Sequence, residues 1–172
     1  NLLVEMGKKT YHRVVVLPEG ALALLLAAGP APGPRAPALP PVPTVVFNGL
    51  SLKGVQFSRA DRVPESLVAA IDRTEKTLLL ALYDLRLPAL ADALLRAQAR
   101  GVAVRLVYDE GHGRTPGIEG GPSAEFSRLL DAGVPTRLLK GGGSFGIMHN
   151  KFAIFDGRLL ATGSFNWTPA AD

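Results

Sequence analysis

The last quarter of the chain carries polar side chains of the types that break phosphodiester bonds. His149 and Lys151 stand two residues apart in "HNKFAIFD", and Ser164 and Asn166 stand two apart in "GSFN". An imidazole with an ordinary pKa of about 6.5 is largely neutral at pH 7 and can attack phosphorus. An ammonium, a hydroxyl and an amide supply hydrogen-bond donors to the nonbridging oxygens, where negative charge develops in the transition state. The four side chains therefore predict a phosphate-cleaving site whose chemistry requires neither a metal ion nor a cofactor.

A β-hairpin is the element that would bring these side chains together. Asp156-Gly157 between two apolar runs is typical of a two-residue turn with positive φ at both positions. We therefore predict antiparallel strands over residues 148–155 and 158–166, with Phe155 opposite Arg158. Counting outward from that pair along both strands, Lys151 faces Thr162 and His149 faces Ser164. Together with Asn166, these residues form one polar face of the ribbon.

The opposite face of the ribbon is expected to pack in the core, with Phe152, Ile154, Leu159, Ala161 and Phe165. The prediction depends on the two-residue turn, because a slip of one residue would move every side chain to the other face. Asp156 has two interpretations, as a residue that orients a base in the site or as an ordinary turn residue. The sequence leaves both open.

The chain before the hairpin alternates between apolar strands and amphipathic helices. Residues 55–57, 77–83, 102–108 and 134–139 are predicted strands, and the run 77–83 is expected to be buried on both faces. The helices between them begin near Pro64, Pro88 and Ser123, and Gly101 and Gly133 follow the second and third. This order predicts an α/β fold with a mostly parallel mixed sheet, helices on both of its faces, and a C-terminal β-hairpin that carries the active site.

Two glycine-rich loops, residues 109–122 and 140–146, interrupt this pattern, and the first follows the end of a strand, where α/β sheets usually place ligands. Glu110 and Arg114 fit either the lining of a substrate groove or ordinary solvated charges. His12 and His112 are interpreted as surface or loop histidines. Trp167 is interpreted as a core residue rather than a stacking platform for a base.

The N-terminal third has a different composition. Residues 1–28 combine early cations with the apolar run 14–28, which is typical either of an export signal or membrane tether, or of a buried strand "RVVVL" and a short helix. Residues 29–43 are rich in proline and predict an extended linker. The folded domain is therefore expected to span residues 44–172.

Composition sets broad limits on function. The 172 residues include 47% hydrophobic residues, which is enough for one domain with a core. The absence of cysteine excludes disulfides and thiolate metal sites, and three histidines leave little scope for metal chemistry. A formal charge of +4 suits a polyanionic partner, such as nucleic acid or an anionic lipid surface.

His149, Lys151 and Asp156 form a His-x-Lys-x4-Asp motif, and "GSFN" is its usual companion. With these motifs, the chain resembles the phospholipase D superfamily, in particular its single-motif nucleases. The resemblance implies a phospholipase D-like fold, catalytic roles for His149, Lys151, Asp156, Ser164 and Asn166, and a phosphohistidine intermediate on His149. It also implies that no metal cofactor is needed and that a second motif's histidine protonates the leaving oxygen, at a twofold or pseudo-twofold interface.

The leading expectation is a metal-independent endonuclease of low sequence specificity, with DNA or RNA as its partner. Because one imidazole cannot conveniently act on both sides of phosphorus, we expect a homodimer or a second motif-bearing half. Two alternatives stay open: a phospholipase D or phosphatidyl transferase that acts on phospholipids, with membrane association through the N-terminus, and an inactive nucleic-acid-binding module.

Overall fold

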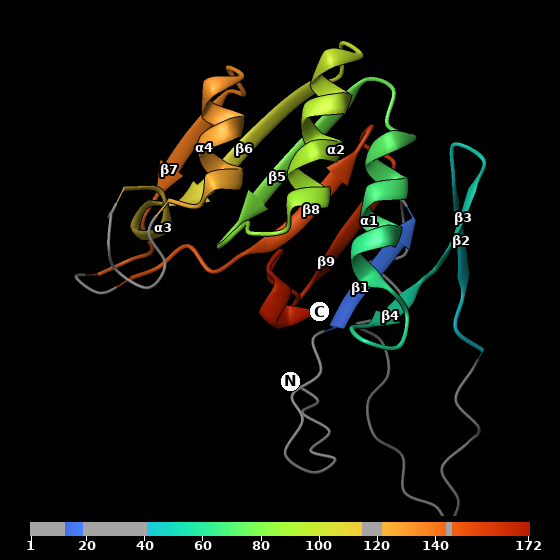
Figure 1. Ribbon diagram of the computed structural model, residues 1–172. Helices are drawn as coiled ribbons and strands as arrows, with labels where there is room; N and C mark the ends of the chain where they lie inside the picture. The colour runs from blue at the N-terminus through green and yellow to red at the C-terminus, as the bar shows by residue number, and fades with distance from the viewer. Residues whose placement is uncertain (1–12, 19–40, 115–121, 144–145) are drawn as a thin grey trace, which may run out of the picture.

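The computed structural model describes residues 13–18 as backbone, and residues 41–114, 122–143 and 146–172 in full. Within these ranges, seven strands form one sheet in the order β4-β1-β9-β8-β5-β6-β7 (Figure 1). In chain order the strands are β1 (Arg13–Pro18), β4 (Val55–Phe57), β5 (Thr77–Leu82), β6 (Ala103–Asp109), β7 (Thr136–Leu139), β8 (Lys151–Phe155) and β9 (Leu159–Gly163).

The sheet is mixed, but it is not mostly parallel as we expected. Strands β5, β6 and β7 run parallel to one another, whereas β8 and β9 are antiparallel to their neighbours, as are β1 and β4. The parallel part is the part whose strands are joined by helices. The C-terminal strands are joined by a tight turn, which reverses the chain and makes the pairing antiparallel.

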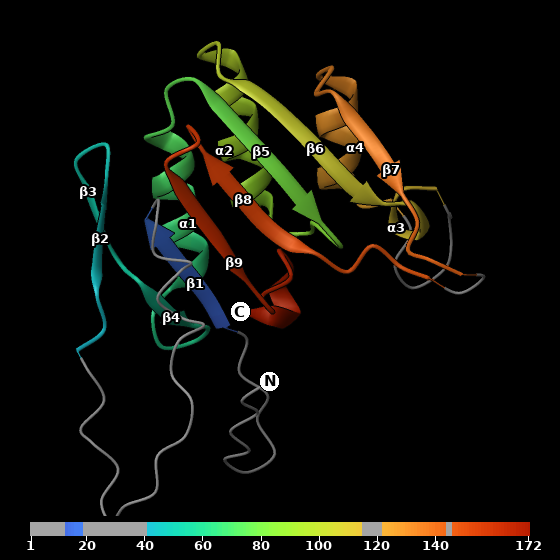
Figure 2. The same cartoon turned by 180° about the vertical axis from the view of Figure 1, so that it is seen from behind.

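The helices α1 (Val63–Asp72), α2 (Pro88–Ala99) and α4 (Ala124–Asp131) all cover the same face of the sheet (Figures 1 and 2). The prediction of helices on both faces is therefore wrong for the described residues. The reason is topological: β5-α2-β6 and β6-α4-β7 step across the sheet in the same direction, and right-handed crossovers then place both helices on one side. A short helix, α3 (Glu110–Arg114), lies at the carboxyl end of β6.

The hydrophobic core lies between the sheet and these helices. Leu78, Leu80 and Leu82 point into it from β5, whereas Leu79 between them is 41% exposed on the open face. The expectation that this strand is buried on both faces is thus wrong, because no described helix covers the second face.

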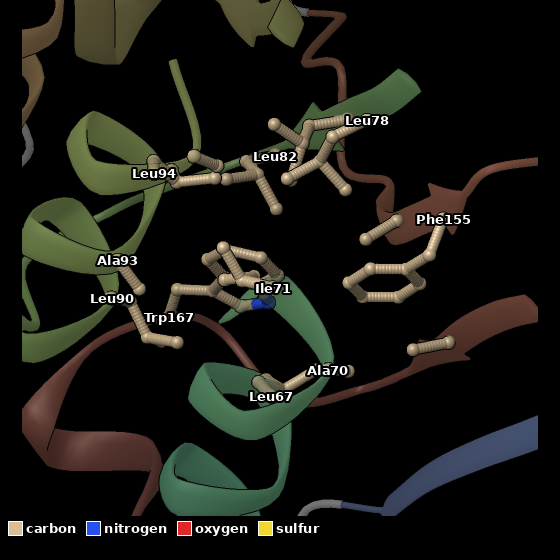
Figure 3. Close-up of a cluster of buried hydrophobic side chains, with 14 of the residues drawn as sticks. Leu67, Ala70, Ile71, Leu78, Leu82, Leu90, Ala93, Leu94, Phe155 and Trp167 are labelled. Carbon is tan, nitrogen blue, oxygen red and sulfur yellow. The ribbon is translucent and has the colours of Figure 1, made fainter. Parts of the chain in front are cut away.

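Trp167 is 3% exposed and lies in the core among residues of α1, α2 and the central strands (Figure 3). The interpretation of Trp167 as a core residue is confirmed. The helix-capping signals also hold, since Gly101 and Gly133 follow their helices with φ of 90° and 75°, values that glycine adopts without strain.

A second, two-stranded sheet lies between β1 and β4 in chain order, with β2 (Thr44–Phe47) and β3 (Leu50–Lys53) joined by a turn at Asn48-Gly49. Val45, Phe47 and Leu52 pack from this hairpin into the core. Residues 13–18 form β1, which pairs with both β4 and β9 inside the main sheet. This strand agrees with the interpretation of "RVVVL" as a strand of the fold. The short helix of that interpretation and residues 29–40 of the proline-rich segment lie outside the described residues.

Candidate active site

The hairpin formed by β8 and β9 has a different register from the predicted one. Asp156 and Gly157 make the expected turn with positive φ, 51° and 66°, and the Arg158 N–H donates to the Phe155 carbonyl at 2.9 Å. Phe155 nevertheless pairs with Leu159 rather than with Arg158. Arg158 thus belongs to the turn, which has three residues instead of two, and every pair is shifted by one.

This shift separates side chains that we expected on one face. Thr162 pairs with Phe152 and not with Lys151. Lys151 shares the helix-covered face with the buried Ala153 and Phe155, whereas Phe152 and Ile154 lie on the open face and are half-buried. The prediction that Lys151 and Thr162 share one polar face is therefore wrong, as is the assignment of Phe152 and Ile154 to the core face.

The polar residues lie together along the edge of the sheet that is formed by the ends of its strands, and not on one face of the hairpin. The carboxyl ends of β5 and β6, the start of β8 and the end of β9 all lie at this edge, with Leu82 paired to Lys151 and Phe152 paired to Thr162. Tyr83 and Asp84 directly follow β5 and thus lie beside the start of β8.

Lys151 is buried, with 7% of its surface exposed. Its ammonium donates a 2.7 Å hydrogen bond to the His149 carbonyl oxygen and lies 5.0 Å from the centre of the Tyr83 ring. Burial lowers the pKa of Lys151 to about 8, because the charged form loses hydration. A cation with so little hydration interacts strongly with an anionic ligand that reaches it.

His149 is exposed, and its ring contacts the Tyr83 ring edge to face, with 4.5 Å between the ring centres. Partial desolvation of the imidazole lowers the pKa of His149, and the neighbouring Lys151 ammonium lowers it further. The imidazole is therefore predominantly neutral at pH 7, the form that can act as a nucleophile. His149 and Lys151, which the sequence pattern placed in one site, do lie together.

Ser164 and Asn166 follow β9 at the same edge of the sheet. Ser164 is exposed and Asn166 is half-buried, and the next residue, Trp167, forms a bridge to Leu85, two residues after Tyr83. The Oδ1 atom of Asn166 is buried and has no hydrogen-bond partner among the described residues. A buried acceptor without a partner is uncommon in proteins and identifies Asn166 as a residue with unused hydrogen-bonding capacity.

Asp156 lies at the opposite end of β8 from Lys151, and this strand is about 15 Å long. Its carboxylate accepts hydrogen bonds from the backbone N–H groups of Glu75, Lys76 and Thr77 and from the Asn48 amide. Burial alone would raise the pKa of Asp156, but these hydrogen bonds outweigh it and lower the pKa. The structure thus places Asp156 at an anchor between the hairpin turn and the start of β5, away from His149.

Three residues near His149 were not among the sequence candidates: Tyr83, Asp84 and Asp109. They follow or end β5 and β6, so the rule that ligand-binding residues gather at the carboxyl ends of parallel strands could have identified them. His112, which we interpreted as a surface or loop residue, also lies here, with its ring centre 4.2 Å from that of Tyr83.

In the part of the chain that the structure describes, no cluster of three or more histidine, cysteine or acidic residues has the geometry of a metal site. None of the described helices is long and apolar enough to cross a bilayer.

Comparison with known proteins gives a consistent result. Residues 67–171 match the family described as "Cardiolipin synthase, PLD-like domain". The chain is 39% identical over 135 residues to a mitochondrial cardiolipin hydrolase of Xenopus laevis, covering 76% of this chain and 60% of that protein. It is 33% identical over 109 residues to a phospholipase D of Rickettsia felis, covering 59% of this chain and 46% of that protein. The chain spans about half the length of the curated relatives it matches.

Among solved structures, the chain is similar to Nuc of Salmonella typhimurium, described as a phospholipase D family member. The TM-score is 0.51 at 32% identity, and the match covers 65% of this chain and 68% of that one. NucT from Helicobacter pylori has the same fold, with a TM-score of 0.50 at 24% identity, covering 62% of this chain and 68% of the other. The resemblance drawn from His149, Lys151 and Asp156 is confirmed: the chain belongs to the phospholipase D superfamily.

Proposed function

We propose that the protein is a phosphodiesterase in which His149 is the nucleophile and Lys151 binds the nonbridging oxygens of the phosphate. The observation that carries this proposal is the pairing of an exposed imidazole of lowered pKa with a buried ammonium at one edge of the sheet. The imidazole is free to attack an external substrate, and the ammonium is already desolvated before substrate arrives.

The proposed reaction has two steps. A ring nitrogen of His149 attacks phosphorus, and the bond from phosphorus to the leaving oxygen breaks as that oxygen accepts a proton from a second imidazole. Water then attacks the phosphohistidine, gives its proton to the second imidazole, and displaces His149 from phosphorus. Ser164 and Asn166 are proposed to donate hydrogen bonds to the phosphate, and the second imidazole is proposed to be His149 of another copy of the chain.

We assign Asp156 a positioning role rather than a place at the reacting atoms. Its carboxylate is occupied by backbone N–H groups of Glu75, Lys76 and Thr77 at the far end of β8. Within the motif, it would thus hold the hairpin in place while the other end of β8 presents Lys151.

Nucleic acid is the proposed substrate, in an endonuclease of low sequence specificity. Support comes from the formal charge of +4 and from the similarity to the single-motif fold of Nuc. A phospholipid substrate is the second candidate, because curated relatives are named cardiolipin hydrolase and phospholipase D.

A single panel of substrates tests both candidates. Purified protein is incubated in EDTA with plasmid DNA, single-stranded DNA, RNA, and vesicles that contain cardiolipin or phosphatidylcholine, alongside His149→Asn. As a control we choose Arg128→Ala, which removes a surface ion pair to Asp92 on the helices α4 and α2. We expect the wild type and the control to cut nucleic acid and the His149 variant to be inactive. Equal cutting by His149→Asn would remove His149 from the mechanism.

Two further outcomes of the panel are informative. Release of headgroups without cutting of nucleic acid would favour the lipid candidate. Binding of DNA with a steep salt dependence, but without turnover of any substrate, would favour the inactive module.

The dimer is tested separately by light scattering on the active species. We expect activity to fall as dilution separates the copies, because each would supply an imidazole to a shared site. Full activity of a monomer would contradict this part of the proposal.

A further inference from the structure

A second histidine lies in the candidate site, and the proposed reaction does not use it. The ring of His112 lies 4.2 Å from the ring of Tyr83, and the ring of His149 lies 4.5 Å from the same ring, both edge to face. The two imidazoles therefore share one aromatic neighbour, and their centres are no farther apart than the sum of these distances.

Both ring nitrogens of His112 face carboxylates. Its Nδ1 atom lies 3.5 Å from Asp109 Oδ2, and its Nε2 atom lies 3.8 Å from Asp84 Oδ2. The side chains of His112, Asp84 and Asp109 are 12%, 11% and 3% exposed, so water screens these interactions little. His112 thus connects the residues that end or follow β5 and β6.

Asp109 extends this connection to the nucleophile. Its Oδ1 atom accepts a buried 2.7 Å hydrogen bond from the Met148 N–H, directly before His149 in the chain. Its Oδ2 atom accepts a 3.2 Å hydrogen bond from the backbone N–H of His112. One carboxylate therefore holds α3 and the backbone next to His149 in a fixed relation.

Two glycines allow α3 to approach this closely. A Cβ atom on Gly113 would lie 2.5 Å from Leu138 Cδ2, and one on Gly111 would lie 3.0 Å from Asp109 Oδ2. A larger residue at either position would force α3 or the contacting side chain to shift. The sequence Gly111-His112-Gly113 therefore fits a close approach of the imidazole to Asp109.

We propose that His112 is a positioning residue of the active site, which fixes Asp109 and Tyr83 and through them the backbone and ring of His149. The catalytic part of this inference rests on the proposed function, but the placement does not. The charged and titratable groups around His112 are Asp84 with its partner Arg86, Asp109, Glu110 and Arg114 on α3, and Tyr83, His149 and Lys151 across the site.

Two substitutions separate packing from hydrogen bonding. His112→Phe keeps a ring against Tyr83 but has no nitrogen for the hydrogen bond to Asp109 or the ion pair to Asp84. His112→Gln keeps a donor but loses the ring. Arg128→Ala is the control, because it removes a cation from the Asp92 carboxylate far from this site.

The first readout is kinetic. We expect kcat of His112→Phe to fall about tenfold with little change in KM, since a small misplacement of a nucleophile slows the chemical step more than binding. The kcat of His112→Gln should fall less than that of His112→Phe. Wild-type kcat in the phenylalanine variant would overturn the role of the nitrogens.

The second readout does not depend on activity. Nuclear magnetic resonance resolves the ring protons of His149, and we expect their chemical shifts and titration midpoint to change in both His112 variants but not in Arg128→Ala. Unchanged His149 signals in both variants, with thermal melting that shows them folded, would overturn the placement itself. If the wild type cuts no substrate while these shifts appear, the proposed function fails and the placement stands.

Discussion

The ammonium of Lys151 donates a hydrogen bond of 2.7 Å to the carbonyl oxygen of His149, two residues earlier in the same chain. The cation thus helps to hold the backbone of the proposed nucleophile while itself being 7% exposed. A neutral carbonyl compensates a buried cation for its lost hydration only in part. An anionic ligand should therefore stabilise the Lys151 ammonium more than its contacts in the free protein do.

We expect Lys151→Met to be inactive yet at least as stable as the wild type. Methionine fills a similar volume without a buried charge, whereas the loss of the cation that we propose to bind phosphate should lower kcat about 100-fold or more. Thermal melting and turnover on the same preparation check this. A variant that melts much earlier than the wild type would show that the ammonium stabilises the fold.

The same lysine should make stability depend on pH. Its pKa is about 8 in the folded chain against an ordinary value of 10.5, so the unfolded chain binds more protons at this position between these values. Stability contributed by this group therefore rises as pH increases through that window. Urea unfolding at a series of pH values should show the rise in the wild type and its absence in Lys151→Met.

The pH dependence of kcat/KM should be bell-shaped. The acidic limb reports protonation of the nucleophilic His149, whose pKa is lowered, and the basic limb reports loss of the proton from the second imidazole or from Lys151, whose pKa is about 8. If the basic limb reports Lys151, Lys151→Arg should shift it upward, because a guanidinium stays charged. An unchanged basic limb in that variant would assign it to another group.

Asp156→Ala should destabilise the fold by about 1–3 kcal/mol, because it leaves backbone N–H groups of Glu75, Lys76 and Thr77 without their acceptor. The lowered pKa of Asp156 means that its contribution is present above its ordinary pKa of 3.8 and is lost as pH falls through the folded value. The difference from the wild type should therefore shrink in acid.

At a temperature where both proteins are folded, kcat of Asp156→Ala should stay close to the wild-type value. A large fall in kcat without a change in melting temperature would instead place Asp156 in the chemistry.

Asn166→Ala should lower turnover about tenfold or more without lowering the melting temperature. The substitution removes a buried oxygen that has no partner among the described residues, so stability loses little, while the proposed phosphate contact is lost. Thermal melting tests the expected stability, and steady-state kinetics test the expected fall in turnover. Leu85→Ala, a core truncation beside the same segment, provides the contrasting case of a large stability loss.

The sequence predicted the elements better than their arrangement. Strand and helix positions followed from local signals such as Pro88, Ser123, Gly101 and Gly133, each of which acts through the backbone of its own segment. The number of helix-covered faces depends instead on the order of strands in the sheet, which no local signal carries.

The same distinction applies to the site. His149 and Lys151 could be paired because they are two residues apart, whereas the register of the hairpin failed at Arg158, which nothing in the pattern marks as a third turn residue. The positions of Tyr83 and Asp109 at strand ends could have marked them as candidates, but their relation to His149, like that of His112, exists only after β5, β6 and β8 come together.

The order of strands in the sheet bears on when the candidate site can assemble during synthesis of the chain. The hairpin of β8 and β9 fills the space between β1 and β5, although it is synthesised after both. In a growing chain, Tyr83 is synthesised before His149, its partner in the ring contact. The candidate site can therefore assemble only after the closing hairpin has been inserted between β1 and β5.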